Sequence, residues 1–321
     1  MIKPLVSISC ITFNQVNYIK QCLNGFLMQK TNFGYEILIH DDCSNDGTKE
    51  IIEDYVEKYP NLIRPIYQTE NQYSQGVRGM MVRYNFSRAK GKYIAMCEGD
   101  DYWTDPLKLQ KQVDVLEANP TIDICSHRSN KFNDEKKIFI GVIGDNGEKT
   151  KVIPTREVIL NYGRVSPMQS ILIRNCKIDE FKTLSLNAFG GHGILQVLWS
   201  YPNGVFYLPD VMGVYRFNSE NSITKHILTN KKYQLNVLKT QIKKLNELDT
   251  HFNFIHTKEF FVKITEVNQK ILSSGIIPVA EKLNFLKTNN IKTLTFLNII
   301  YLIKGFMSSL KFKIKTIFFR I

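Results

Sequence analysis

Two acidic clusters contain the residues whose types and spacing are suited to chemistry. Residues 40–48 read HDDCSNDGT, and residues 98–103 read EGDDYW. Adjacent carboxylates repel each other unless a cation or hydrogen bonds compensate, so Asp100-Asp101 indicates a divalent metal. An oxygen-only ligand set favours Mg²⁺ or Mn²⁺ over Zn²⁺, and such a metal would bridge a diphosphate and offset leaving-group charge. A carboxylate beside it would accept hydrogen bonds from the ribose or base of a nucleotide.

The elements that must position these clusters alternate between strand-like and helix-like segments through residues 1–130. We expect strands at 5–11, 36–40, 62–67 and 92–97, and helices at 18–29, 47–59, 80–89 and after Asp105-Pro106. This rhythm predicts an α/β fold with a doubly wound, mostly parallel sheet and right-handed crossovers. Each acidic cluster directly follows a strand, and ligands bind at the carboxyl ends of strands in such sheets.

Simpler explanations exist for the individual residues. Asp46 has the position of a helix cap, Asp41 that of an ordinary turn residue, and an isolated Asp-Asp pair is usually a solvated turn. Two such clusters after separate strands of one sheet are harder to explain in this way. The pattern as a whole therefore favours a nucleotide–metal site.

Charge and cysteine usage exclude several other classes. The 321 residues carry a formal charge of +12, and residues 282–321 supply eight basic and no acidic side chains, which leaves about +4 for the rest. A basic excess confined to one end argues against a nucleic-acid coat, so no nucleic-acid partner is expected. Six cysteines without a CxxC pair indicate reduced, structural thiols. With no secretory signal at the N-terminus and no apolar run long enough to span a bilayer, a cytoplasmic protein is predicted.

The C-terminal part is expected to be helical from residue 226, with a domain boundary near 225. If residues 305–321 form a helix, its apolar face carries Leu310, Ile314, Ile317, Phe318 and Ile321, with Lys311 and Lys315 beside it. A basic amphipathic helix of this kind binds anionic membrane surfaces, which would place the protein on the inner face of the cell membrane. The alternative is a helix that packs on the catalytic domain with a solvated basic face.

Several motifs in order resemble a family 2 glycosyltransferase with the GT-A fold, over about residues 4–218. They are Val6-Ser7-Ile8 with Thr12-Phe13-Asn14, then Asp41 to Thr48, then Gly91 to Ala95 with Glu98-Gly99-Asp100-Asp101. The run at 101–110 is similar to a bacterial subgroup that builds surface polysaccharides. The resemblance implies a glycosyltransferase domain at 1–225, with a nucleotide-sugar half at 1–130 and an acceptor half at 131–225, followed by a helical region at 226–321.

The resemblance also implies roles in the donor half. Thr12, Phe13, Asn14 and Asp42 would bind the nucleotide end of the donor, and Asp100 would face its ribose or diphosphate. Asp101 would be the closest metal ligand. Glu98 stands where the first acid of the family's Asp-x-Asp motif belongs, and Arg78 or Arg83 would reach the diphosphate, since guanidinium pairs well with phosphate oxygens.

The acceptor half departs from the family pattern. Family members carry a Gly-Asp pair whose Asp is the general base, and His192 stands at that position, among glycines that favour an exposed loop. Imidazole is able to take a proton near its ordinary pKa of ~6.5, although it lacks the fixed negative charge of a carboxylate. Asp210 or Glu180 are alternative bases. Downstream, Asn218 replaces the His of the family's Val-Tyr-Arg-x-His segment.

The leading hypothesis is an inverting, metal-dependent transferase. It would move a sugar from a nucleoside-diphosphate donor, with a UDP-sugar as the leading candidate, to a glycan or lipid-linked oligosaccharide. The alternative is a nucleotide-binding relative whose transfer activity is weak or lost because His192 replaces the base. A nucleotide-dependent dehydrogenase is disfavoured, because Thr12-Phe13-Asn14-Gln15 follows the first strand in place of a Gly-x-Gly-x-x-Gly loop.

Overall fold

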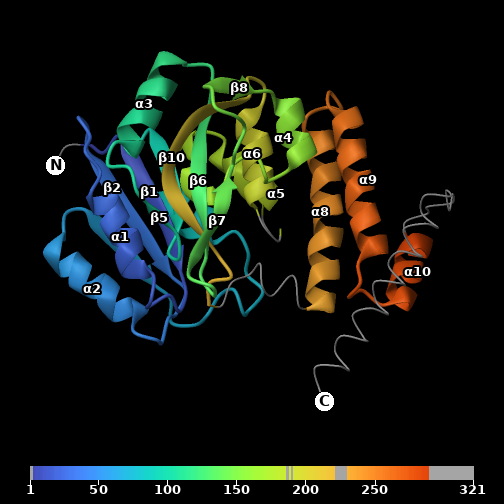
Figure 1. Ribbon diagram of the computed structural model, residues 1–321, viewed down its shortest axis with the longest axis horizontal. Helices are drawn as coiled ribbons and strands as arrows, with labels where there is room; N and C mark the ends of the chain where they lie inside the picture. The colour runs from blue at the N-terminus through green and yellow to red at the C-terminus, as the bar shows by residue number, and fades with distance from the viewer. Residues whose placement is uncertain (1–2, 186–187, 189–190, 221–229, 289–321) are drawn as a thin grey trace. The chain divides into compact units, whose positions relative to one another are not determined.

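The computed structural model describes residues 3–185, 188, 191–220 and 230–288. The chain divides into two compact units, Met1–Asn221 and Ser222–Ile321, each of which is described by itself (Figure 1). The predicted boundary near 225 and the amphipathic tail at 305–321 both lie outside the described residues.

The first unit is built on one ten-stranded mixed sheet, as predicted for a GT-A fold. Its main path runs in the order β3-β2-β1-β4-β9-β6-β10-β5, with β7 paired to β6 and β8 paired to β10. The strands are β1 Val6–Thr12, β2 Tyr35–Asp41, β3 Ile63–Tyr67, β4 Tyr93–Glu98, β5 Tyr102–Trp103, β6 Ile124–Asn133, β7 Ile138–Ile143, β8 Lys151–Ile153, β9 Leu172–Arg174 and β10 Val205–Phe217. The first four are parallel to one another, β10 is parallel to β6, and the other pairs are antiparallel.

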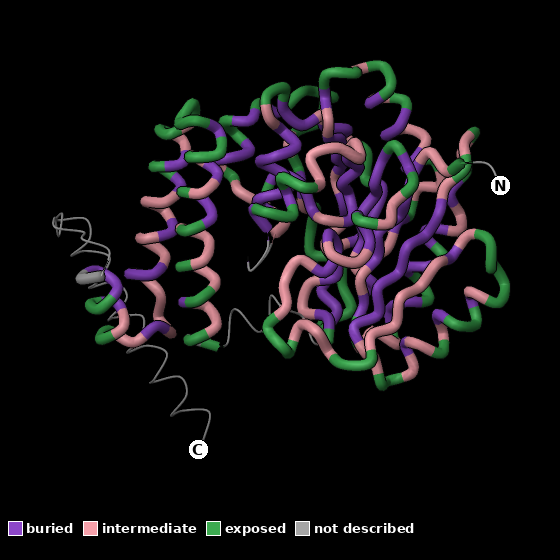
Figure 2. The backbone as a smooth tube through the Cα atoms, turned by 180° about the vertical axis from the view of Figure 1, so that it is seen from behind, coloured by how far each residue is buried: buried purple, intermediate pink, exposed green. Residues whose placement is uncertain are grey.

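Helices cover both faces of this sheet. They are α1 Ile19–Leu27, α2 Thr48–Lys58, η1 Met81–Asn85, η2 Phe86–Arg88, α3 Lys108–Ala118, α4 Thr155–Asn161, η3 Met168–Ser170, α5 Ile178–Ser185 and α6 His192–Ser200. Strand side chains alternate between faces, so Val6, Ile8 and Cys10 of β1 share a core with α1, α2 and α3. Figure 2 shows the central strands as buried throughout most of their length.

The predicted helix at 80–89 has the right position but a different form. Met81–Asn85 is a π-helical turn and Phe86–Arg88 a 3₁₀ turn. The π turn places the amide of Asn85 against the sheet, where its Nδ2 donates to Ser9 Oγ at 3.2 Å, Cys10 O at 2.9 Å and Leu38 O at 3.2 Å. This side chain is fully buried, so it joins the irregular helix to both β1 and β2.

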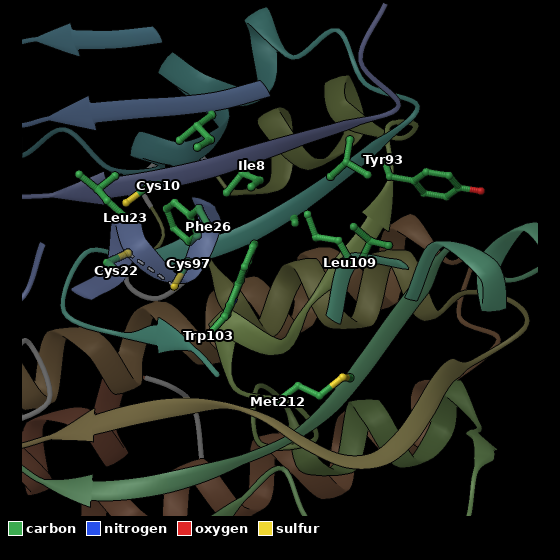
Figure 3. Packing of buried hydrophobic residues seen from close by; sticks show 14 of the residues in the cluster. Ile8, Cys10, Cys22, Leu23, Phe26, Tyr93, Cys97, Trp103, Leu109 and Met212 are labelled. Carbon is green, nitrogen blue, oxygen red and sulfur yellow. Dashed lines mark hydrogen bonds between the residues drawn. The ribbon is translucent and has the colours of Figure 1, made fainter. Parts of the chain in front are cut away.

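The core between the sheet and α1 is centred on Trp103 (Figure 3). Phe26 meets the Trp103 ring edge-on, with ring centroids 4.7 Å apart. Gly25 lies directly on the Trp103 backbone, because a Cβ added at Gly25 would stand 2.9 Å from the nitrogen and 3.0 Å from the oxygen of Trp103. Beside them Cys22 Sγ donates to Cys97 Sγ at 4.0 Å, and the two cysteines form no disulfide.

The second unit contains three described helices, α8 Lys231–His251, α9 Thr257–Ser273 and α10 Val279–Thr288. One apolar cluster in this unit consists of Leu235, Ile271, Ile277 and Phe285, with Leu238 and Ile242 packed against them. Within the described residues, no helix combines the length and the apolar character needed to cross a bilayer.

Candidate functional site

The sheet brings the two acidic clusters to one edge. Thr12 pairs with Asp41 across β1 and β2, and Ile11 pairs with Glu98 across β1 and β4. The amide of Asp42 donates to Thr12 O at 3.0 Å, and the amide of Gly99 donates to Ile11 O at 2.9 Å. The clusters therefore leave β2 and β4 on either side of β1, two strand spacings or about 10 Å apart.

Gly99 allows the second cluster to pack against the end of β1. A Cβ at this position would collide with Gln15 Oε1 and would lie 2.9 Å from Thr12 Oγ1. Thr12 Oγ1 itself donates to Gln15 Oε1 at 2.8 Å. The absence of a side chain at Gly99 is thus a condition for the two halves of the site to meet.

The first cluster organises its own loop. Asp46 stands one residue before Gly47, the N-cap of α2, and its Oδ1 accepts from the amide of Thr48, the first helical residue, at 3.0 Å. Asp41 accepts from the Ser44 amide at 3.0 Å. Asp42 uses both carboxylate oxygens to hold the next loop, accepting from the Gln72 amide at 2.8 Å and the Tyr73 amide at 3.0 Å. Roles in a turn and at the start of a helix therefore account for the contacts of Asp41 and Asp46, whereas Asp42 fixes the loop at the rim of the site.

The second cluster concentrates negative charge in a buried place. Burial, together with the neighbouring Asp100, raises the pKa of Glu98 to about 7. Burial and the charges of Asp100 and Glu98 raise the pKa of Asp101 well above its usual range. Asp101 Oδ1 accepts from the Arg216 amide at 2.8 Å, whereas its buried Oδ2 has no hydrogen-bond partner among the described residues. A buried carboxylate oxygen that receives no hydrogen bond favours a positively charged ligand.

Arg216, near the end of β10, is the cation that meets this cluster. Its Nη1 donates to the carbonyl of Asp100 and its Nη2 to Gln21 Oε1. The guanidinium carbon lies 5.0 Å from the Tyr18 ring centroid and 4.6 Å from that of Tyr102. One guanidinium thereby joins α1, the acidic turn and β10.

Two further contacts support this arrangement. Tyr18 Oη donates to Asp134 Oδ2 at 2.7 Å, and Asp134 Oδ1 lies 3.9 Å from Arg216 Nε. Ser219 Oγ donates to Asp100 Oδ2 at 2.7 Å. The side chain of Asp100 is thus held from the segment that follows β10, and the turn between β6 and β7 is tied to the same guanidinium.

The donor set partly fits the predicted Mg²⁺ or Mn²⁺. No group of three or more His, Cys, Asp or Glu side chains in the described parts of the chain is arranged to hold a metal ion by itself. Mg²⁺ sites often use only one or two carboxylates, and the substrate's phosphates and water complete the coordination. The free Oδ2 of Asp101 and the neighbouring Glu98 match this second type of site.

The other predicted donor residues have different surroundings. Arg78 Nη1 donates to Tyr73 O and Val77 O, and Arg83 Nε donates to Arg78 O, all at 2.8 Å. These contacts bind both arginines to residues 73–78 and do not reach the acidic turn. Asn14 adopts a left-handed backbone with φ of 50° and connects to the 44–45 loop. Phe13 beside it is exposed at the rim.

The structure corrects the expected surroundings of His192. It is the first residue of α6 and not part of an exposed loop, because the flanking Gly193 lets the helix pack directly on the Tyr162 ring. Its Nε2 lies 2.6 Å from Gln196 Nε2, and Gln196 in turn donates to Ser166 O. Burial lowers the pKa of His192 to about 4, so the imidazole is neutral and weakly basic at pH 7.

The two alternative bases, Asp210 and Glu180, have other surroundings: Asp210 forms an ion pair, and Glu180 lies on the surface. Asp210 forms an ion pair with Lys111 at 2.9 Å on the outer side of α3. It precedes Arg216 by six residues on β10, roughly 20 Å at the rise of an extended strand. Glu180 is exposed in the first turn of α5.

Comparison with known proteins places this site in a family. The family model described as "Glycosyl transferase family 2" matches residues 7–163, which include both acidic clusters. Residues 7–163 belong to glycosyl transferase family 2. The GT-A fold inferred from the motifs is supported by a solved structure, S. aureus TarS in complex with UDP-GlcNAc, which has a TM-score of 0.60, is 17% identical and is matched over 94% of this chain and 79% of its own.

Curated relatives extend the likeness beyond the matched segment. The uncharacterized protein Rv1520 of Mycobacterium tuberculosis is 34% identical over 224 residues, or 66% of this chain, and the chain spans 58% of its length. The Bacillus subtilis protein named "Putative teichuronic acid biosynthesis glycosyltransferase TuaG" is 35% identical over 114 residues, covering 36% of this chain and 42% of its own.

Sequence reasoning missed the role of Arg216 as the cation at the family 2 acidic turn. A signal was available, because Val214-Tyr215-Arg216 resembles the family's Val-Tyr-Arg segment. The diphosphate-binding role of Arg78 and Arg83 stays a prediction. Tyr18 and Asp134 carried no signal of their own, since 116 residues separate them in the chain.

Proposed function

We propose that the chain is an inverting, metal-dependent glycosyltransferase that uses a nucleoside-diphosphate sugar, with UDP-sugars as the leading donors. The acceptor is a glycan or lipid-linked oligosaccharide in bacterial surface polysaccharide synthesis. The observation that carries the proposal is the buried Asp101 Oδ2, which has no hydrogen-bond partner among the described residues and lies beside Glu98 and Asp100 where β4 ends. The similarity to TuaG supports the polysaccharide context.

The residues of the chain divide the work in this proposal. Asp42 holds the 71–73 loop at the nucleotide side, and Arg216 holds the acidic turn. Asp101, with Glu98 nearby, would bind the Mg²⁺ or Mn²⁺, which would neutralise charge on the departing diphosphate. In an inverting transfer, an acceptor hydroxyl forms a bond to the anomeric carbon as the bond to the diphosphate oxygen breaks, and a base takes the hydroxyl proton.

Calorimetry with UDP tests the donor side. We expect Mn²⁺ to strengthen UDP binding to the wild type at least tenfold, and to have little effect on Asp101→Ala. Asp54→Ala removes an exposed carboxylate from α2 and serves as the matched control. Equal metal dependence in wild type and Asp101→Ala would remove the metal assignment, and no UDP binding by the wild type would remove the proposed donor class.

One observation favours the alternative, a nucleotide-binding relative with weak or lost transfer. The pKa of His192 falls to about 4, and a base works best with a pKa near the operating pH. If this alternative holds, His192→Asp creates sugar transfer that the wild type lacks, measured as UDP release with membrane extract as acceptor. Transfer by the wild type that His192→Ala abolishes would instead establish the histidine as the base.

A further inference from the structure

An aromatic pair continues the row of side chains that begins at Arg216. Arg216 of β10 is the register partner of Phe132 on β6, and Phe132 is the register partner of Phe139 on β7. Side chains of register partners point to the same face of a sheet. Arg216, Phe132 and Phe139 therefore stand in one row across three neighbouring strands, spaced by about 4.8 Å per strand. Figure 1 shows these strands, β10, β6 and β7, close together.

The pair presents an open ring to solvent. The Phe132 and Phe139 centroids are 5.1 Å apart at an interplanar angle of 65°, and Phe139 is 59% exposed. Val142 and Asn130 are register partners one step further along the same face, so an apolar surface with an amide at its side adjoins the ring. The turn that joins β6 and β7 is fixed by Asp134, which contacts Tyr18 and Arg216.

We propose that Phe132 and Phe139 form a platform that binds a pyranose ring of the acceptor. This inference rests on the proposed function, because the row starts at the guanidinium that holds the donor's acidic turn. A pyranoside has a face of C–H groups that stacks on an aromatic ring, while its hydroxyls need polar neighbours such as Asn130. A sugar seated here lies one to two strand spacings from Arg216, beside the donor end of the site.

Two other occupants fit this surface less well. A second copy of the chain would add its own strand to the outer edge of β7, but a bulge interrupts that edge. Ile140 and Gly141 stand together opposite the single residue Lys131, and Gly141 has φ of 126°. Bulges of this kind protect edges from strand addition. A membrane would leave the outer backbone groups of β7 unpaired in hydrocarbon, which is costly.

Saturation-transfer NMR with methyl glucoside, methyl N-acetylglucosaminide and methyl mannoside tests the platform, with and without UDP and Mn²⁺. We expect saturation of the ring C–H protons of at least one glycoside by the wild type. Phe139→Ala and Phe139→Leu should weaken binding about tenfold, the loss expected for a central aromatic contact, whereas Phe139→Trp retains it. The leucine variant separates an aromatic face from mere apolar area.

Ile138→Ala is the matched control. Ile138 lies on the same strand and is 51% exposed, but it pairs with Asn133 and therefore points to the opposite face. We expect it to bind glycosides as the wild type does. No saturation by the wild type, or equal binding by wild type and Phe139→Ala, would overturn the platform.

The other occupants are tested in parallel on the same variants. If sedimentation equilibrium detects self-association of the wild type that Phe139→Ala weakens, the surface binds a second copy. If the wild type co-sediments with phosphatidylglycerol vesicles and Phe139→Ala does not, the surface binds a membrane. Either result overturns the platform. If the wild type does not bind UDP, the donor proposal is wrong. The glycoside measurements still decide independently whether Phe132 and Phe139 bind a sugar ring.

Discussion

Lys108 provides a prediction with a magnitude that follows from its surroundings. The side chain is fully buried on α3, its Nζ lies 3.8 Å above the Trp103 ring centroid, and it has no hydrogen-bond partner among the described residues. Burial lowers the pKa of its ammonium group from 10.5 to about 7. We predict that Lys108→Met stabilises the first unit, because methionine keeps the apolar stem on Trp103 and removes the buried charge.

The size and pH dependence of this effect follow from linkage. The folded pKa lies about 3.5 units below the unfolded value, which corresponds to ~5 kcal/mol at 1.36 kcal/mol per unit. This cost is present in full below about pH 7, where the lysine is charged in both states, and it vanishes above pH 10.5. Lys108→Met should therefore gain about 5 kcal/mol at pH 6.5 and about 1 kcal/mol at pH 9.5.

Urea unfolding followed by tryptophan fluorescence measures this directly, because Trp103 and Trp199 both lie in the first unit. Lys49→Met is the control, since Lys49 lies 5.3 Å above the Tyr67 ring but is half-exposed. Its stability change should be small and independent of pH. A destabilised Lys108→Met, or an advantage that grows between pH 6.5 and pH 9.5, would refute the reasoning.

Three further predictions concern the site and its support. Gly99→Ala should weaken UDP binding about tenfold in calorimetry, because the new methyl group displaces Gln15 and Thr12, whereas Gly34→Ala, whose nearest neighbour would be 3.9 Å away, should not. Arg216→Lys should lower UDP affinity in Mn²⁺ about tenfold, since a lysine cannot contact both Asp100 and Gln21, and unchanged affinity would contradict this role. Asn85→Leu should lower the free energy of unfolding by ~2–4 kcal/mol in urea titrations, because three acceptors lose their donor; a change below ~1 kcal/mol would show that water replaces the amide.

Most of the fold of residues 1–130 could be predicted from the sequence because its signals are local. Buried strands such as Val6–Thr12 read as apolar runs, and the acidic clusters follow them directly, so the parallel sheet fixes where they meet. Asp105-Pro106 was expected to open the next helix, but α3 begins at Lys108 with Leu107 at the N-cap. Asp105 Oδ1 accepts from the Leu107 amide at 2.8 Å, so Asp105 precedes the N-cap instead of occupying it.

The contacts that complete the site depend on distant parts of the chain. Arg216 and Gln21 are 195 residues apart, and no spacing rule connects them. His192 shows the opposite difficulty. The glycines around it indicated a loop, whereas Gly191 is the N-cap of α6 and Gly193, inside the helix, packs on the Tyr162 ring. Asn85 lies in a segment whose apolar periodicity indicated an ordinary helix, and its amide bonds to the sheet accompany a π turn instead.

The contact of Gly25 with the Trp103 backbone limits how this protein can acquire a new substrate. Helix α1 has no layer of side chains between itself and the peptide that follows Asp101 and Tyr102, so a sliding movement of the helix would carry the acidic turn with it. Diversification must then proceed by exchange of rim side chains such as Phe13. A directed-evolution library for altered donor choice should keep positions 25 and 103 constant and randomise the rim.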